Sequence, residues 1–239
     1  MSAPHRVVSH DEWIKARQAF LAEEKEFTRR RDELSQRRRE LPWEVVTKEY
    51  VFDGPNGQES LADLFGGRSQ LIVYHFMFGP DWTTGCPGCS FWADNFNGVI
   101  THLNQRDVTL VSASRGAYGK LAAYQKRMGW TFKWVSSGQT TFNLDFQASF
   151  TPEEVERKAA LFNYVVQDPR HSEREGASVF YKDSEGQIFH TYSTYARGLD
   201  LMNTAYNYLD LVPKGRDEGG RGPYWVRRHD EYATVASTA

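Results

Sequence analysis

The sequence predicts an α/β fold, in which helices alternate with strands. Short apolar runs typical of buried strands alternate along the chain with segments whose apolar residues recur at helical spacing. Such alternation favours right-handed crossovers and parallel pairing of the strands. The chain has 239 residues, of which 40% are hydrophobic and 14% aromatic. It is therefore long enough to bury one substantial core and to carry an appendage.

The first expected element is a charged helix from about Ser9 to Leu41. Ser9 suits the N-cap because Glu12 stands three residues later, and Pro42 follows the end of the helix. Arg and Glu are its commonest residues, and an apolar residue recurs at every seventh position, namely Trp13, Phe20, Phe27, Leu34 and Leu41. This narrow stripe suits a helix laid across its own domain or against a partner subunit. Residues 1–42 are therefore expected to be an N-terminal helical arm, through which the chain could form a homodimer.

A hairpin and a buried strand are expected next. Residues 48–52 indicate a strand, residues 53–57 a tight turn, and residues 59–65 a return into a helical turn. The apolar run 71–78 then predicts a buried strand. From Phe91 onward the apolar residues recur at helical spacing as far as Leu103, which predicts a helix.

The second half of the domain continues the alternation. Strands are expected over 108–112 and 130–136, separated by an amphipathic helix that ends before Gly129. The remaining elements are a helix that starts at Thr151-Pro152, a hairpin over 177–192 and a final helix from about 199 to 211. The segment beyond is rich in Gly and Arg and is expected to be loosely held, with Tyr224, Trp225 and Tyr232 as candidate anchors.

The two cysteines carry the clearest chemical signal. Cys86 and Cys89 stand one helical turn apart, where the strand ends and the helix begins. Pro87 suits the first turn of that helix, because its missing N–H would have no intrahelical partner there. Cys86 then falls near the N-cap, where free amides and the helix dipole can lower a cysteine pKa from about 8.5 to roughly 3.5–7.5. The spacing predicts Cys86 as a nucleophile and Cys89 as its resolving thiol.

Three other interpretations of the cysteines stay open. Two free cysteines packed in a core are common, although a core does not require this spacing. A zinc site needs four ligands, so two of the seven histidines would have to converge on the pair. A structural disulfide is disfavoured, because the chain is not small and no secretory leader is expected. No resident metal and no cofactor are therefore expected.

Composition restricts the partners and the location. A formal charge of −2 argues against broad binding to nucleic acid or to an acidic membrane. Arg29–Arg31 and Arg37–Arg39 are basic clusters, but the acidic residues between them favour a solvated helix face. The longest apolar run has eight residues, too few to cross a bilayer. We expect a cytoplasmic protein with no membrane partner.

His75 lies on the predicted strand 71–78 and is interpreted as a hydrogen-bonded core histidine.

The order of the elements resembles the thioredoxin fold, a three-layer α/β/α arrangement. Five motifs also resemble the bacterial family known as domain of unknown function 899 (DUF899), namely YHFMFGP at 74–80, CPGCSF at 86–91, HLNQRD at 102–107, RMGW at 127–130 and TYSTYARG at 191–198. This resemblance implies a thioredoxin-like domain, expected over residues 43–212 with a tail at 213–239. It implies no particular substrate.

Two enzyme mechanisms remain open. In a peroxiredoxin, a threonine and an arginine hold the peroxide that the thiolate attacks. Thr83 has the required spacing to Cys86 and Arg115 could supply the guanidinium, but Pro80 lies one residue too near. The thioredoxin pattern has a proline before the strand at 177, where residues 174–176 hold none.

We therefore expect a thiol-disulfide oxidoreductase with an antioxidant role. Its expected partners are a disulfide or peroxide substrate and an external thiol reductant. The alternatives are a thiol peroxidase of the peroxiredoxin type and a non-catalytic thioredoxin-fold interaction module.

Overall fold

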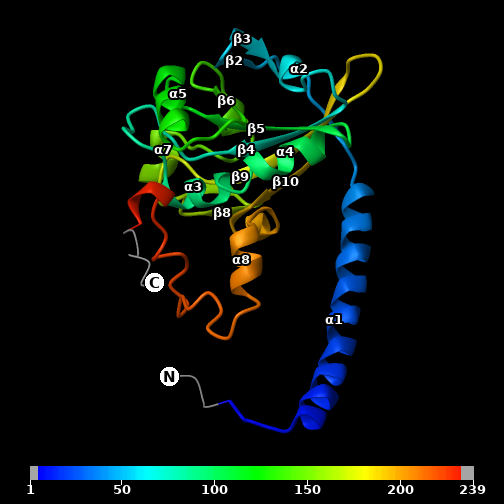
Figure 1. Cartoon of the computed structure of the whole chain (residues 1–239). Coiled ribbons are helices and arrows are strands. Elements are labelled where there is room, and N and C mark those ends of the chain that lie inside the picture. The colour runs from blue at the N-terminus through cyan, green and yellow to red at the C-terminus, as the bar shows by residue number, and fades with distance from the viewer. Residues whose placement is uncertain (1–4, 233–239) are drawn as a thin grey trace. The chain divides into compact units, whose positions relative to one another are not determined.

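The computed structural model describes residues 5–232 of the chain. Its contacts group into two compact units, Met1–Pro42 and Trp43–Ala239. The helices and strands of both are labelled in Figure 1. The first unit is built on one long helix, and the second on a sheet covered by helices.

Helix α1, His10–Arg39, confirms the predicted N-terminal helical arm. It begins with a capping box. The Ser9 hydroxyl accepts a hydrogen bond from the Glu12 N–H at 3.3 Å, and the Glu12 carboxylate accepts one from the Ser9 N–H at 3.1 Å. No residue of the helix is buried, and each of the five apolar residues of the stripe is at least 45% exposed. Within residues 5–42, no other side chain therefore buries the stripe.

A sheet of eight strands runs through the described part of the second unit, in the order β1-β10-β9-β4-β5-β6-β2-β3. Strands β4, β5 and β6 are parallel, whereas β9 runs antiparallel to both β4 and β10. The strand bounds are β1 Glu44–Val45, β2 Val51–Gly54, β3 Gly57–Ser60, β4 Gln70–His75, β5 Val108–Ser114, β6 Lys133–Ser136, β9 Gly176–Lys182 and β10 Ile188–Tyr195. The expected parallel centre is present, with an antiparallel hairpin on each side.

Short helices connect the strands. Their bounds are α2 Leu61–Leu64, α3 Pro87–Ala93, α4 Asn97–Asn104, α5 Tyr118–Arg127, α6 Phe142–Asp145, α7 Pro152–Glu156 and α8 Thr204–Leu209, with 3₁₀ segments at Ala196–Met202 and His229–Glu231. The predicted cap of α7 is present, because the Thr151 hydroxyl accepts the Glu154 N–H at 3.3 Å.

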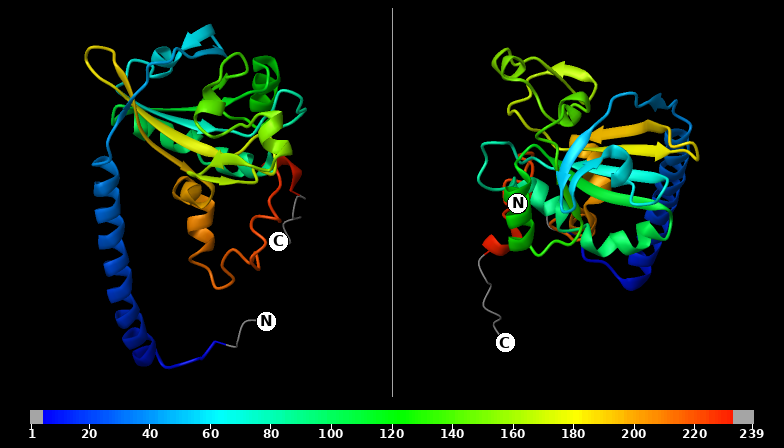
Figure 2. Two further views of the ribbon diagram at one scale, coloured as in Figure 1. Left: turned by 180° about the vertical axis from the view of Figure 1, so that it is seen from behind. Right: turned by 90° about the horizontal axis from the view of Figure 1, so that it is seen from above.

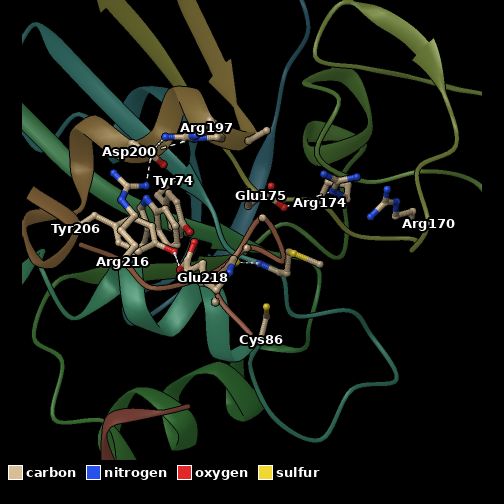
Figure 3. A pocket seen from close by; sticks show the side chains of 18 residues that line it. Tyr74, Cys86, Arg170, Arg174, Glu175, Arg197, Asp200, Tyr206, Arg216 and Glu218 are labelled. Atoms are coloured by element: carbon tan, nitrogen blue, oxygen red, sulfur yellow. Dashed lines mark hydrogen bonds and ion pairs between the residues drawn. The ribbon is translucent and has the colours of Figure 1, made fainter. Parts of the chain in front are cut away.

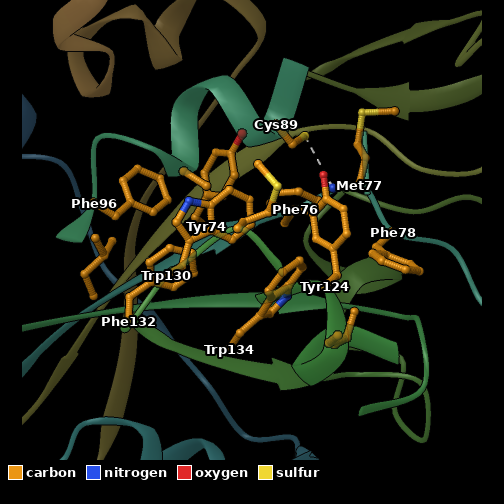
Figure 4. Close-up of a cluster of buried hydrophobic side chains, with 14 of the residues drawn as sticks. Tyr74, Phe76, Met77, Phe78, Cys89, Phe96, Tyr124, Trp130, Phe132 and Trp134 are labelled. Atoms are coloured by element: carbon orange, nitrogen blue, oxygen red, sulfur yellow. Dashed lines mark hydrogen bonds between the residues drawn. The ribbon is translucent and has the colours of Figure 1, made fainter. Parts of the chain in front are cut away.

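The sheet has an apolar core on each face. Side chains alternate along β4, so Leu71 and Val73 pack with α2 and α6, while Ile72 and Tyr74 pack with α3, α4 and α5. Figure 4 shows the second of these clusters, in which Trp134 is only 1% exposed. Helices on both faces of a mixed sheet confirm the predicted three-layer, thioredoxin-like α/β fold.

The predicted helix over 91–103 is divided in two. Helix α3 ends at Ala93 and α4 begins at Asn97. Between them, the Asn95 side-chain amide donates to the carbonyl oxygens of Phe91 and Trp92, at 2.8 and 3.1 Å. A side chain that bonds to nearby carbonyls offers the backbone an alternative to the helix. This local competition ends α3 after two turns.

The predicted final helix, residues 199–211, is also divided. Asn203 has an extended backbone (φ −113°, ψ 97°) between the 3₁₀ segment and α8. Its side chain accepts the Tyr206 N–H at 3.2 Å and so caps α8. A second N-cap inside the predicted helix thus separates it into two short pieces.

Two other differences concern the hairpins. The ladder of β2 and β3 pairs Gly54 with Gly57, so the strands extend into the predicted turn.

A small sheet made of β7, Ala160–Phe162, and β8, Val165–Gln167, was not expected. Figure 2 shows this hairpin beside the main sheet. Strand β8 is exposed along its length, which explains the lack of a buried-strand pattern.

The segment 213–232 is held more firmly than its composition suggests. Trp225 packs edge-on against Phe91 of α3, with ring centroids 5.4 Å apart, and Val226 is 5% exposed. Arg127 of α5 forms an ion pair with Asp230 at 2.7 Å. In Figure 2 the red C-terminal segment accordingly lies against the green α5. Of the expected anchors, Trp225 fulfils that role, whereas the side chain of Tyr224 is 49% exposed.

Candidate functional site

The dithiol lies where the sequence places it, at the junction of β4 and α3. Cys86 is the N-cap of α3 and Pro87 takes the first helical position. Both thiols are free; Cys86 is half-buried and Cys89 is 3% exposed. The Cys86 N–H donates to the Met77 carbonyl at 3.2 Å, and the Met77 N–H donates to the Cys89 sulfur at 3.4 Å, as drawn in Figure 4. These two bonds tie the cysteine loop to the chain that leaves β4.

The two thiols have opposite acidities. The Cys86 pKa is lowered to about 7, and a hydrogen bond from the Cys89 thiol is the largest cause. Burial raises this pKa, but the N–H groups of Cys89 and Gly88 also lower it. Burial raises the pKa of Cys89 well above its ordinary value, and the neighbouring Cys86 adds to this rise. One sulfur is therefore poised as a thiolate near neutral pH while its neighbour holds its proton.

A chain of hydrogen bonds holds the carbonyl oxygens of Gly85 and Cys86 in place. Ser90 Oγ donates to the Cys86 carbonyl at 2.8 Å and bonds to Tyr124 Oη at 2.9 Å. The Arg228 guanidinium donates to the same Tyr124 hydroxyl at 3.0 Å and to the Gly85 carbonyl at 2.7 Å. A Cβ on Gly85 would lie 2.7 Å from the Tyr124 ring, so a larger residue does not fit there. Arg228 thus fixes the residue that precedes Cys86.

Both cysteines line a cavity of 730 Å³, shown in Figure 3. The loop before β9 contributes one wall, at the position where the thioredoxin pattern has a proline. There the charge of Glu175 opposes the acidity of Cys86, but this effect is smaller than that of the hydrogen bonds. The charged residues around the cavity are Arg170, Arg174, Glu175, Arg197, Asp200, Arg216 and Glu218. The dithiol therefore opens onto a space large enough for a small organic molecule.

The two supporting residues expected for peroxide chemistry lie elsewhere. Thr83 is exposed in the loop before α3, and it does not line the cavity. Arg115 is held by the buried Glu173, whose carboxylate accepts from Arg115 Nε at 2.9 Å, and it does not line the cavity either. Cys86 and Cys89 thus line the cavity and Pro87 starts α3 between them, whereas Thr83 and Arg115 do not join the cavity wall.

The interpretation of His75 agrees with the structure. The ring is fully buried, with Nε2 2.9 Å from Ser178 Oγ, and burial lowers its pKa to about 4.

Within residues 5–232, no three side chains of the types that bind metals gather closely enough to hold an ion. Among the helices of the same residues, none combines the length and the apolar character needed to span a bilayer.

Fold and site together define a thioredoxin-fold protein with a free Cys-x-x-Cys dithiol at the start of a helix. The sequence matches the family model described as bacterial protein of unknown function (DUF899) over residues 2–232. The chain belongs to this family, which confirms the resemblance found in its motifs. No curated protein sequence matches the chain.

Solved structures similar to this chain include three peroxiredoxin-type proteins. Peroxidoxin BcpB from Mycobacterium tuberculosis is 12% identical, with 69% of this chain and 94% of that chain covered and a TM-score of 0.46. Peroxiredoxin Q from Xanthomonas campestris is 16% identical, with 69% and 95% covered and a TM-score of 0.47. The yeast mitochondrial 1-Cys peroxiredoxin is 12% identical, with 71% and 78% covered and a TM-score of 0.40.

Proposed function

We propose that this protein is a thiol-disulfide oxidoreductase in which Cys86 is the nucleophile and Cys89 the resolving thiol. The observation that carries the proposal is the placement of the two thiols: Cys86 is the half-buried N-cap of α3 beside the cavity, whereas Cys89 is only 3% exposed. The pKa shifts, downward for Cys86 and upward for Cys89, agree with these roles. A nucleophile must be a thiolate at working pH, and a resolving thiol must not compete with it for the substrate. Residues 43–212 would form the catalytic domain, with residues 1–42 as an arm and 213–239 as a tail whose Glu218 lines the cavity and whose Arg228 supports the cysteine loop.

The reaction proceeds in two exchanges. The Cys86 thiolate attacks one sulfur of a disulfide, forms a mixed disulfide and releases the other half as a thiolate. Cys89 then loses its proton and attacks the Cys86 sulfur, which releases the second half and closes the Cys86–Cys89 disulfide. The substrate gains two electrons, and an external dithiol returns them to the protein. A reducing compartment such as the cytoplasm supplies such a reductant.

An alkylation profile tests the proposal. In the variant Cys89→Ser, the serine hydroxyl can still donate to Cys86, so the rate of reaction with iodoacetamide should rise through a midpoint well below 8.5 and close to 7. The variant Cys86→Ser is the matched control, and its buried Cys89 should react slowly up to high pH. A Cys86 midpoint at or above 8.5 would instead support a non-catalytic thioredoxin-fold module.

The alternative enzyme is a thiol peroxidase, for which the spacing of Thr83 to Cys86 is the supporting observation. Reactivity toward a peroxide and toward a disulfide distinguishes a thiol peroxidase from a thiol-disulfide oxidoreductase. Reduced protein is mixed with hydrogen peroxide or with 2-hydroxyethyl disulfide, and the loss of free thiols is followed by alkylation and mass spectrometry. We expect the disulfide to be reduced with a second-order rate constant above that of a free cysteine. Acceleration of the peroxide reaction alone would favour the peroxidase.

The apolar stripe of α1 supports self-association of the chain. Four large apolar side chains of the stripe stay exposed on a helix that carries no buried residue, with Leu41 just beyond its end, and a second copy could cover them. We expect light scattering after size-exclusion chromatography to show a dimer. The double variant Phe20→Glu, Phe27→Glu should be monomeric. The control Gln18→Glu adds a charge at an exposed position outside the stripe and should remain dimeric. A wild-type monomer at all concentrations would contradict the proposal.

A further inference from the structure

We infer that the substrate of the dithiol is a small zwitterionic disulfide, one that carries both carboxylate and ammonium groups. The inference rests on the proposed function and adds a substrate class to it. The cavity beside Cys86 has a volume of 730 Å³. Pockets of 300–1,000 Å³ hold small organic ligands, so the space exceeds what a peroxide alone would fill.

One side of the cavity offers an unpaired positive charge. Among the residues that the structure describes, the Arg170 guanidinium has no acceptor, and only the backbone N–H of Arg170 is bonded, to Asp168. Arg174 stands four residues later on the same wall. Its guanidinium lies 4.0 Å from the centre of the Phe162 ring, bonds to Glu175 at 3.4 Å and donates to the Pro169 carbonyl at 3.3 Å, which leaves some of its five N–H donors unused. Both guanidinium groups can therefore donate to a carboxylate of a bound molecule.

Another side offers an unpaired negative charge. The Glu218 carboxylate accepts hydrogen bonds from Tyr206 Oη at 2.8 Å and from Trp225 Nε1 at 3.0 Å, both of which are neutral donors. Within residues 5–232 no cationic side chain pairs with it. Figure 3 shows Arg170 and Arg174 on one side and Glu218 toward the other, beside Tyr206. An ammonium group of the same ligand would supply the missing counter-charge.

The other charged groups of the cavity already have partners. Arg216 pairs with Asp200 at 2.9 Å and with Asp210 at 2.7 Å, and Arg197 pairs with Asp200 at 3.0 Å. Charges that neutralise each other contribute little to the choice of a ligand. The free positive charge of Arg170 and the free negative charge of Glu218 remain, and they favour a molecule with both signs of charge.

Four disulfides of different charge test the inference. They are 2-hydroxyethyl disulfide, which is neutral, dithiodipropionate, which has two carboxylates, cystamine, which has two ammonium groups, and cystine, which has both. The rate constant for forming the Cys86–Cys89 disulfide is measured for each by rapid alkylation and mass spectrometry. Cystine should react fastest, about tenfold faster than the neutral compound. Equal rates for all four would overturn the inference and leave the proposed function standing, whereas rates no faster than those of free cysteine would overturn the proposed function.

Charge-neutralising variants identify the side chains that bind the charged groups of the disulfide. Arg170→Gln should slow dithiodipropionate and cystine about tenfold, and Glu218→Gln should slow cystamine and cystine by a similar factor. Glutamine at 218 can still accept from Tyr206 and Trp225. The neutral disulfide should react with both variants at the wild-type rate. The control Arg157→Gln, an exposed position outside the cavity, should change none of the four rates. Losses that are the same for all four compounds would overturn the inference.

Discussion

Replacement of Cys86 by serine is expected to abolish disulfide reduction, with a loss on the order of 10³-fold or more, because a serine hydroxyl is not ionised near neutral pH. Cys89→Ser should instead leave the first attack intact and stop the reaction at the mixed disulfide. Mass spectrometry after incubation with 2-hydroxyethyl disulfide distinguishes the two variants. The first should gain no adduct, whereas the second should gain one half of the reagent on Cys86.

A third variant, Cys89→Ala, tests the origin of the acidity. The hydrogen bond from the side chain at position 89 is the largest of the effects that lower the Cys86 pKa. Alanine removes this donor and serine retains one, so the alkylation midpoint of Cys86 should be higher with alanine than with serine. If Cys86→Ser kept its reactivity through Cys89, the assigned roles of the two thiols would be reversed.

The variant Arg115→Met is expected to destabilise the protein by about 3–5 kcal/mol, the range found when one partner of a buried ion pair is removed. Glu173 is fully buried, and its carboxylate accepts from Arg115 Nε at 2.9 Å and from Ser149 Oγ at 2.6 Å. Methionine would leave that carboxylate with the serine alone. Urea unfolding measures the loss, with the exposed Arg157→Met as a control that should stay close to wild type.

The same variant should show a defined pH dependence. Burial raises the pKa of Glu173, and the Arg115 guanidinium partly opposes this rise. Without Arg115, the folded protein holds a proton that the unfolded chain releases above its ordinary glutamate pKa, near 4.3. Stability then falls as pH rises through the window from that value to the raised folded pKa. The deficit should be smaller at pH 5 than at pH 7.5. If Arg115→Met kept the wild-type stability but lost the reaction with peroxide, Arg115 would instead belong to the reactive site.

Signals carried by neighbouring residues predicted the fold well. The capping boxes at Ser9 and Thr151, the apolar run of β4 and the Cys-Pro-Gly-Cys junction each depend on a few adjacent positions. The breaks at Asn95 and Asn203 were missed, because an asparagine in a helical pattern shows its bonding only once its neighbours are placed. Strand β8 was missed because its exposed residues carry no buried pattern.

The candidate site was predictable only in part. The dithiol spans four consecutive residues at the start of α3, and the sequence places it there correctly. The walls of the cavity come from distant segments that carry no local motif. Arg228 bonds to the Gly85 carbonyl across 143 positions. A glycine- and arginine-rich tail gives no sign of such a contact, and the periodicity of single elements does not reveal it.

The contact of Arg228 with Gly85 also bears on how the chain matures during synthesis. A nascent polypeptide that has left the ribosome as far as α5 already contains β4, β5 and both cysteines, but it cannot form this bond until residue 228 has been translated. The turn before Cys86 would therefore reach its final geometry late. Chains released early would present an unsupported thiol to cellular oxidants.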